Sequence, residues 1–252
     1  MCNPLGLEEC RILAEALGDA PETVDSVHLL RQGMCKAYVA GDPSRFGAAI
    51  VQANDWPTEP TGFGSDPQVL WELLKAVSGW DCILVGSECA LMLGEIIEQE
   101  MRVGVRYVDA VSHVLTKSVS RVDDKAVRQL APADLDLLES APPEFRINCW
   151  GSAHALLSEG IVACAISSRQ IVATAWTVAR SPRHADLGVY THQDFRCRGL
   201  ATAAASIVAR RVQQAGQTPV WGVGEPNKAS LRVALKLGFI EVSRRTYVIL
   251  EK

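Results

Sequence analysis

The feature that most constrains the fold is a strand that leads through a basic, glycine-containing loop into an alanine-rich helix. The pattern predicts a strand over His184–Thr191, a loop over His192–Arg198 and a helix over Leu200–Ala215 that ends at Gly216. Alanine has the highest helix propensity of all residues, which supports this helix. A strand followed directly by a helix is a basic unit of α/β proteins, so the segment indicates a mixed α/β fold.

The segments around this unit predict more strands and helices. Two apolar runs, Gly160–Ile166 and Ile171–Ala179, flank the turn Ser-Ser-Arg-Gln, which is a hairpin pattern. A helix is expected from Ala131 to about Ser140, before a pair of prolines. The elements expected after the alanine-rich helix are a strand over Val220–Val223, a helix over Asn227–Leu237 capped by Gly238, and a strand over Glu241–Leu250.

The first half of the chain also alternates between strand and helix patterns. We therefore predict two lobes, residues 1–120 and 126–252, joined by the polar segment Thr116–Arg128. A loop is expected over Asp55–Pro67, which is rich in Pro, Gly and Thr. The helices expected in this half are 7–17, 68–77 and 90–101, and the strands are 35–40, 46–52, 82–86 and 103–108.

Composition argues against several classes of protein. The apolar runs are all shorter than the roughly 18 residues of a membrane span, and the first residues lack the pattern of a signal peptide. The eight cysteines are scattered and form no CxxC pair, which argues against a zinc site and a disulfide scaffold. We therefore expect a cytoplasmic protein with buried thiols and no metal.

The net charge of −4 is unevenly distributed along the chain. Residues 1–119 carry a net charge of −9 and residues 120–252 a net charge of +5. A basic second half suits a polyanionic ligand such as a nucleotide cofactor, although it can equally be incidental surface charge. Because the chain has no dense Lys/Arg run with interleaved aromatic residues, we expect no nucleic-acid partner.

The residues of the basic loop suit a phosphate-binding site. A helix N-terminus exposes unpaired N–H groups and the positive end of the helix dipole. Gly199 has no Cβ, so the backbone can approach a pyrophosphate closely. The small side chain of Ala201 leaves room for the phosphate groups, and the Thr202 hydroxyl can donate a hydrogen bond to them. Arg196 and Arg198 add cationic donors. The alternative is an ordinary strand-to-helix turn with solvated arginines.

Two motifs resemble those of the GCN5-related N-acetyltransferases, the GNAT superfamily. Arg196-Cys197-Arg198-Gly199-Leu200-Ala201 matches the signature R/Q-x-x-G-x-G/A, and the segment from Asn227 to Leu237-Gly238-Phe239 resembles the second motif. The resemblance covers roughly residues 126–252. It implies a GNAT fold, a mixed, mostly antiparallel, splayed sheet flanked by helices. It also implies transfer of an acetyl group from acetyl-CoA, or another short acyl-CoA, to an amine without a metal.

The resemblance also implies roles for particular residues. Backbone groups of Val189 and Thr191 would pair with the pantetheine arm, as an added strand pairs with a sheet edge. Asn227 and Ser230 would lie beside the pantetheine and the sulfur. The pyrophosphate would be held by Arg196 and by the amides of Cys197, Arg198, Gly199, Leu200, Ala201 and Thr202.

The catalytic positions depart from the family pattern. Ala185 stands where several members carry a glutamate, and Ala234 stands where a tyrosine often acts as the acid. Asp186 is the candidate base, but strand alternation places it on the opposite face unless a bulge intervenes. Its alternative role is to pair with a surface arginine. The candidate substitutes for the tyrosine are Tyr190, Ser230 and Glu225.

The first half more weakly resembles glycine N-acyltransferase-like proteins, on the stretch Asp55–Gly64. We therefore predict a second, degenerate GNAT-like lobe that lines a pocket for a small-molecule amine; an unrelated α/β domain is the alternative. Two other functions stay open at this point, a module that senses acyl-CoA without turnover and a protein or peptide N-acetyltransferase. The sequence also leaves open whether the protein forms a homodimer.

Overall fold

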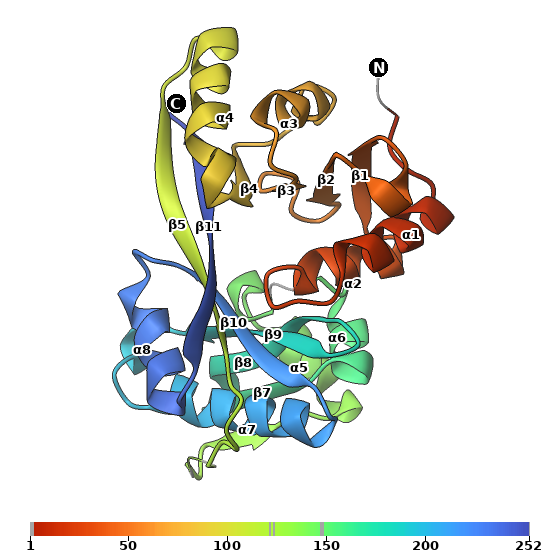
Figure 1. The fold of residues 1–252 in the computed structure, drawn as a ribbon. Coiled ribbons are helices and arrows are strands. Elements are labelled where there is room, and N and C mark those ends of the chain that lie inside the picture. The colour runs from red at the N-terminus through yellow and green to blue at the C-terminus, as the bar shows by residue number, and fades with distance from the viewer. Residues whose placement is uncertain (1–2, 121, 123, 147–148, 252) are drawn as a thin grey trace.

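The structure is a computed structural model that describes residues 3–120, 122, 124–146 and 149–251 of the 252-residue chain. The described strands form one sheet of 11 strands in the order β1-β2-β3-β4-β11-β5-β10-β9-β8-β7-β6 (Figure 1). Only the pairs β3–β4 and β9–β10 are parallel, which confirms a mixed, mostly antiparallel sheet. The strands are β1 (Cys35–Ala40), β2 (Ala48–Ala53), β3 (Thr61–Phe63), β4 (Cys82–Gly86), β5 (Val105–Val114), β6 (Val127–Gln129), β7 (Val162–Ser167), β8 (Gln170–Arg180), β9 (His184–Thr191), β10 (Thr218–Gly224) and β11 (Ile240–Leu250).

Helices flank this sheet, and most of them were expected from the sequence. Local chemistry sets several of their ends: Asp66 caps α3 by accepting from the N–H groups of Gln68 and Val69, and Gly238 ends α8 in the left-handed conformation. The α-helices are α1 (Leu7–Leu17), α2 (Val24–Gln32), α3 (Pro67–Leu74), α4 (Ser87–Met101), α5 (Leu135–Glu139), α6 (Ala153–Glu159), α7 (Leu200–Gln214) and α8 (Lys228–Leu237).

Four elements were not expected, namely α2, α6, β3 and β6. β3 lies inside the Pro- and Gly-rich segment 55–67 that the sequence analysis predicts to be a loop, and it has only three residues. The pattern does contain a signal for α2, because Val24, Val27 and Leu30 recur at helical spacing before Gly33. The hairpin β7–β8 was expected, and its turn residues Ser168 and Arg169 both adopt positive φ, as a tight hairpin turn requires.

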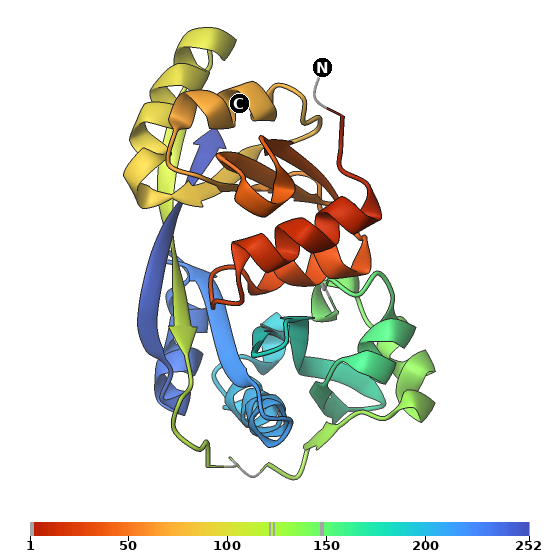
Figure 2. The same ribbon diagram turned by 45° about the vertical axis from the view of Figure 1, so that its right-hand side comes forward.

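Helices cover both faces of the sheet in each half (Figures 1 and 2). In the second half, α7 packs on one face of β7, β8 and β9, while α5 and α6 cover the other face. In the first half, α3 and α4 pack on one face of β2 and β4, and α1 and α2 cover β1 and β2 from the other. None of the helices in the described residues is long and apolar enough to cross a membrane.

Strands β5 and β11 join the two halves. β5 pairs with β10 along Ala110–Val114 and with β11 along its whole length, and β11 also pairs with β4. The sheet therefore continues across the predicted boundary near residue 120. Val248 of β11, from the end of the chain, is fully buried in the core formed by α3, α4 and β4. Neither half has a complete core without the other's strand.

The loop before α2 and α2 itself also contact the second half directly. The His28 ring nitrogens lie 3.1 Å from the Arg180 carbonyl oxygen and 3.0 Å from that of Cys149. Asp19 lies 2.6 Å from His184 Nδ1 and accepts a hydrogen bond from the Ser181 hydroxyl, also at 2.6 Å. These contacts fix α2 over the face of β8 and β9 that α7 does not cover.

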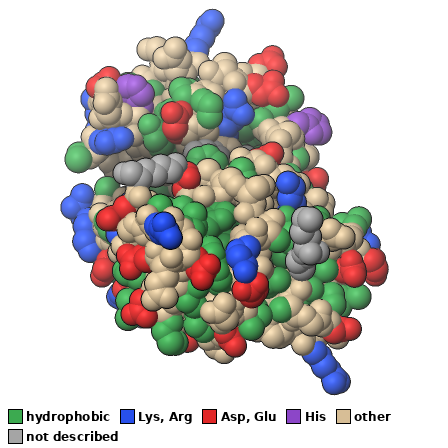
Figure 3. Space-filling view, turned by 90° about the horizontal axis from the view of Figure 1, so that it is seen from above, with side chains coloured by type: hydrophobic (Ala, Val, Ile, Leu, Met, Phe, Trp, Pro, Cys, Tyr) green, Lys and Arg blue, Asp and Glu red, His purple; other side chains and the backbone are tan. Residues whose placement is uncertain are grey.

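The surface mixes charges where it is seen from above (Figure 3). On this face, Lys and Arg side chains of the described residues stand singly among Asp and Glu side chains and apolar groups. The first half of the chain lies nearest the viewer on this face (Figures 1 and 3).

The joined sheet predicts a specific effect on stability. We expect Val248→Ala to lower the free energy of unfolding by about 2 kcal/mol, because it leaves a cavity in the core of the first half. That corresponds to a fall in Tm of roughly 5 °C, as measured by scanning calorimetry. The same change in the same strand, Val242→Ala, is the control, since Val242 is 47% exposed. Equal effects of the two substitutions would contradict the joined core.

Candidate active site

The site begins where two parallel strands separate. β9 and β10 pair only through His184–Asp186 and Thr218–Val220, and the rest of β10 turns to β5. Just beyond the last pair, the Gly222 N–H donates to Asp186 Oδ1 at 3.1 Å. The Asp186 side chain thus accepts the hydrogen bond of a β10 amide at the point where the backbone pairing of β9 and β10 ends. We refer to this opening as the fork.

One edge of β9 faces the fork, because β10 pairs with β9 only as far as Asp186. Immediately after β9, the His192 N–H donates to the carbonyl of Val172 in β8 at 2.9 Å. Because backbone groups alternate along an antiparallel strand, those of Val189 and Thr191 point to the other edge, into the fork. The backbone groups of Val189 and the N–H of Thr191 are available to an extended ligand that adds itself to the sheet, whereas the Thr191 carbonyl accepts a hydrogen bond from Arg196 Nε.

The basic loop forms a concave anion site at the start of α7. Cys197 and Gly199 adopt positive φ, 62° and 80°, which turns successive amides inward. Gly199 is the N-cap, no side chain caps the helix, and its first turn holds no acidic residue. The helical ladder begins with Ala203 N–H to Gly199 O, so the amides of residues 200–202 precede it. The helix start is left open for an external anion.

The two arginines of this loop brace it. Arg198 donates to the Asp194 carbonyl at 2.9 Å, and its guanidinium lies 4.9 Å from the centre of the Phe195 ring. Arg196 Nε donates to the Thr191 carbonyl at 3.2 Å. The loop is therefore ordered by its own side chains before any ligand binds, and both guanidinium groups keep donors for an anion.

A groove of about 640 Å³ runs from the fork to this loop, and we call it the loop groove. All eleven residues that the sequence analysis assigns to cofactor binding line it: Val189, Thr191, Arg196, Cys197, Arg198, Gly199, Leu200, Ala201, Thr202, Asn227 and Ser230. The fold thus brings together residues from β9, the loop, α7 and α8.

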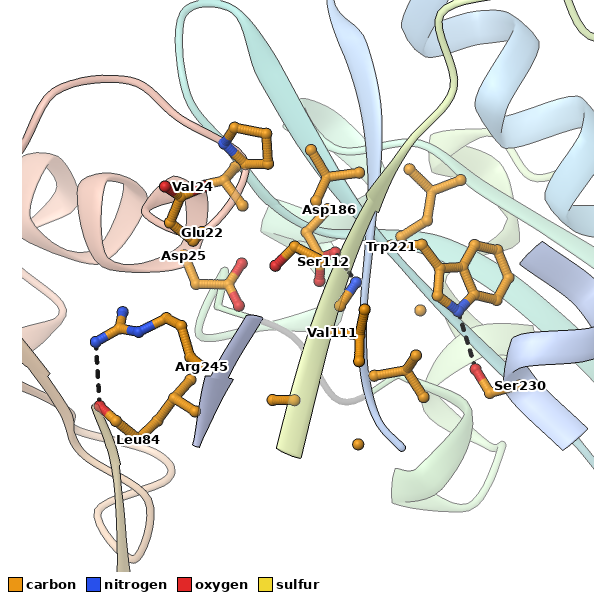
Figure 4. A pocket seen from close by; sticks show the side chains of 18 of the residues that line it. Glu22, Val24, Asp25, Leu84, Val111, Ser112, Asp186, Trp221, Ser230 and Arg245 are labelled. Atoms are coloured by element: carbon orange, nitrogen blue, oxygen red, sulfur yellow. Dashed lines mark hydrogen bonds between the residues drawn. The ribbon is translucent and has the colours of Figure 1, made fainter. Parts of the chain in front are cut away.

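A second cavity, of about 390 Å³, lies at the fork on the side covered by α2, and we call it the inner cavity (Figure 4). It shares Val189, Asn227 and Ser230 with the loop groove, so the two spaces meet there. Polar and charged side chains enter it from both halves: Glu22, Asp25, Ser112, Asp186, Arg245 and Tyr247.

Asp186 lies on the face opposite α7, as strand alternation predicts. Ala185 is buried against α7, whereas Asp186 faces the inner cavity. The irregularity in this strand pair falls on β8, between Thr177 and Ala179, rather than on β9. Since the inner cavity itself lies on this opposite face, no bulge in β9 is needed to bring Asp186 to it.

Asp186 and Asp25 are close enough to influence each other. Burial raises the pKa of Asp186 well above its usual value, and the negative charge of Asp25 raises it further. Asp25 comes from α2, and its side chain is open to the cavity and points towards Asp186 (Figure 4). Desolvation by the cavity walls raises the pKa of Asp25 as well. The inner cavity therefore holds two carboxyl groups that keep protons to a higher pH than isolated ones.

Hydrogen bonds fix the side chains at the junction of the two spaces. Asn227 Oδ1 accepts the Ser230 N–H at 3.1 Å, which caps α8. The buried indole of Trp221 donates to Ser230 Oγ at 2.9 Å (Figure 4). Because Ser230 accepts there, its own hydroxyl hydrogen can turn to another acceptor, such as one in the cavity.

The other candidates are placed differently. Tyr190 lines the loop groove and packs edge-on against Phe145. Glu225 pairs with Arg244 at 3.7 Å, and Ala234 is fully buried. Sequence reasoning missed Asp25, Arg245 and Tyr247 as site residues, because their positions depend on how α2 and β11 cross the fork.

Groups of three or more His, Cys, Asp or Glu side chains that could hold a metal ion are absent from the described part of the chain. The seven cysteines described, Cys10, Cys35, Cys82, Cys89, Cys149, Cys164 and Cys197, are free thiols.

A forked sheet with an open helix N-terminus beside the fork defines a class of acyltransferases, and comparison with known proteins agrees. The model of the GNAT acetyltransferase family matches residues 88–249. The chain therefore belongs to the GNAT acetyltransferase family, whose members use acetyl-CoA. The match begins before residue 126, where the resemblance in the sequence starts, and includes α4 and β5.

Individual relatives are distant. The uncharacterized N-acetyltransferase YdfB of Bacillus subtilis (strain 168) is 26% identical over 97 residues, 38% of this chain and 37% of the relative. The match thus spans little more than a third of that protein.

Solved structures share the fold over the whole chain. The GCN5-related N-acetyltransferase-like protein from Streptococcus suis 89/1591 aligns with a TM-score of 0.70 at 20% identity, covering 98% of this chain and 100% of that one. A tandem GNAT protein from the clavulanic acid biosynthesis pathway aligns with a TM-score of 0.53 at 13% identity, covering 98% and 97%. At these identities the likeness establishes the GNAT fold.

The anion site can be tested with a matched pair of glycines. Gly199 and Gly216 flank α7, have φ of 80° and 77°, and leave open space around an added Cβ. Glutamate at either position carries a similar backbone strain of about 1 kcal/mol, but only Gly199→Glu places negative charge beside the amides of the loop. We expect Gly199→Glu to weaken acetyl-CoA binding at least tenfold in calorimetric titration and Gly216→Glu to leave it unchanged. Similar affinities in the two variants would count against the site.

The raised pKa of Asp186 predicts how stability depends on pH. A carboxyl group with a raised pKa in the folded state contributes stability below its unfolded pKa of about 3.9, and this is lost as pH rises through the folded value. Asparagine keeps an acceptor for Gly222 but has no charge to bury. The Tm of Asp186→Asn relative to wild type should therefore be higher at pH 8 than at pH 4.5. Asp136→Asn, at an exposed position in α5, is the control. A Tm difference for Asp186→Asn that does not vary with pH would contradict the shift.

Proposed function

We propose that this protein transfers an acetyl group from acetyl-CoA to the amine of a small molecule that binds in the inner cavity. The observation that carries this proposal is the meeting of the loop groove and the inner cavity at Val189, Asn227 and Ser230. The loop groove has the features of a nucleotide site, and the inner cavity holds the carboxyl groups of Asp25 and Asp186. A group bound in the first can be presented to a molecule bound in the second only at this junction.

The residues of the loop groove fit acetyl-CoA. The amides of residues 197–202 would hold the pyrophosphate at the open start of α7, with Arg196 and Arg198 beside it. The free edge of β9 at Val189 and Thr191 would pair with the amide groups of the pantetheine arm. This arrangement leads the arm along the fork and ends it next to Asn227 and Ser230.

Acetyl-CoA supplies the acetyl group as a thioester, which an amine can attack directly. The amine nitrogen forms a bond to the carbonyl carbon, the carbon–sulfur bond breaks, and one proton must leave the nitrogen. Asp186 would accept this proton, and its position in the wall of the inner cavity at the fork supports this role. Its raised pKa makes it a stronger base than an exposed aspartate.

Ser230 would stabilise the negative charge that forms as the thioester breaks. Its hydroxyl lies at the junction and is oriented by the indole of Trp221. From there it can donate to the developing negative charge on the carbonyl oxygen or to the departing sulfur. It would thus take over part of the role that Ala234 cannot fill.

The first half of the chain would act as the lid of the acceptor site. α2 and the turn before it cover the inner cavity and contribute Asp25, and they are held to the second half through His28 and Asp19. A cavity of about 390 Å³ that is partly covered in this way suits a small amine better than a protein or peptide chain. The likeness in fold to a tandem GNAT protein supports the view that this half is a degenerate second GNAT-like lobe.

Steady-state kinetics of Asp186→Asn test the reaction. With acetyl-CoA and a panel of primary amines, we expect wild type to release CoA and form N-acetyl product. Asp186→Asn should lower kcat by about 10²–10⁴-fold, the usual contribution of a general base, and leave acetyl-CoA affinity unchanged. The kcat of wild type should rise with pH as Asp186 loses its proton, and the variant should lack this limb. Asp136→Asn is the control.

Two results would count against the proposal. If wild type binds acetyl-CoA but acetylates no amine, the protein is better described as a module that senses acyl-CoA. If Asp186→Asn keeps the kcat and the pH profile of wild type, another group accepts the proton.

A further inference from the structure

Arg245 is a buried cation in the wall of the inner cavity. It lies on β11, is only 8% exposed and lines the cavity, and its guanidinium lies on the side of the first half, next to Leu84 (Figure 4). Its Nη2 donates to the Gly62 carbonyl and to the Leu84 carbonyl, the latter at 3.3 Å, and its guanidinium stacks 4.6 Å from the centre of the Phe63 ring. The guanidinium is therefore held rigidly in one position.

The other end of this guanidinium has no partner. Nη1 is buried and makes no hydrogen bond, and none of the ion pairs among the described residues involves Arg245. Desolvation lowers the pKa of Arg245 to about 10, and the charge of Glu22 offsets only part of this effect. A buried cation with an unused donor is costly unless an anion or another acceptor completes it.

The contacts that Arg245 does make do not need Nη1. Nη2 and the ring contact already tie β11 to β3 and β4. The neighbouring Arg244 shows the alternative arrangement, since it is exposed and pairs with Glu241 at 2.6 Å. An arginine with only a structural role could pair with a nearby carboxylate, as Arg244 does. The unused donor of Arg245 therefore points to a ligand in the cavity.

The acidic and basic side chains of the inner cavity occupy different parts of it. In Figure 4, Asp25 lies between Arg245 on one side and Asp186 on the other. The carboxyl groups at the fork suit a protonated amine that arrives for acetylation, whereas the guanidinium suits an anion. With about 390 Å³, the cavity is at the small end of ligand pockets.

We propose that the acceptor carries a carboxylate as well as its amine, and that Arg245 binds this carboxylate while Asp25 and Asp186 receive the amine. The inference rests on the proposed function, since it assumes that the acceptor occupies the inner cavity. Its substrate class is that of small amino acids, α or ω, rather than simple alkylamines or polyamines. Arg245 then determines specificity and orients the amine towards the fork.

Matched substrates test the charge requirement directly. Glycine, β-alanine and 4-aminobutyrate differ from their methyl esters only in the anionic group. We expect wild type to acetylate at least one of the free acids with a kcat/KM at least tenfold higher than that of its ester. Arg245→Met should remove this preference by lowering the value for the acid and sparing the ester. Arg245→Lys should restore part of it. Arg244→Met, a loss of the adjacent exposed arginine, should leave the preference intact.

A binding measurement covers the case in which Arg245→Met folds poorly and separates the two proposals. Protein saturated with CoA should bind the N-acetyl derivative of the preferred acid, or N-acetyl-β-alanine if no acid is acetylated, but not its methyl ester. This is measured with wild type and with Arg245→Lys. If wild type acetylates alkylamines and esters as well as acids, or binds both derivatives alike, the carboxylate site is wrong and the transferase stands. Binding of the acid derivative without any acetyl transfer would keep the anion site and overturn the transferase.

Discussion

The structure depends on the separation of β9 and β10 after three residue pairs. Had the two parallel strands paired to their ends, the sheet would offer neither the free edge at Val189 and Thr191 nor the space beside it. Asp186 sits at this point and accepts the Gly222 N–H, so the side chain ends the ladder and faces the cavity at once. β5 pairs with β10 and β11, and this pairing brings the first half of the chain against the fork. One local break in pairing thus positions the loop groove, the inner cavity and the lid.

The inner cavity brings together charged side chains that lower the stability of the folded protein. Two carboxyl groups with raised pKa values and a buried guanidinium with an unused donor all weaken the folded state when no ligand is present. The surrounding core offsets this cost, because Trp221 and Phe239 pack edge to face and His28 and Asp19 hold α2 over the cavity. Such a concentration of costly groups around one cavity is characteristic of a functional site.

The second half of the chain could be predicted in detail from its sequence, and the first half only in part. Strong periodicity and glycine caps are local signals, so β9, α7 and α8 were expected within a residue or so of their ends. The eleven cofactor-binding candidates all line one groove, and they come from two short stretches of the chain, 189–202 and 227–230. Helix α2 was missed although its apolar spacing is present, and β3 was missed because three residues carry no periodic signal. The predicted division near residue 120 is crossed by a sheet whose strand order depends on long-range pairing.

By itself, then, the sequence determined the class of fold, the open N-terminus of α7 and the resemblance to acetyltransferases. These follow from residues near one another in the chain, whose backbone preferences and spacing act locally. The tertiary structure alone decided that Asp186 meets Asp25 and that Arg245 enters the same cavity. Those residues come from β9, α2 and β11, far apart in the chain, and only the crossing of β5 and β11 between the halves brings them to one place. Their chemistry depends on their meeting in one cavity, which no local pattern in the sequence predicts.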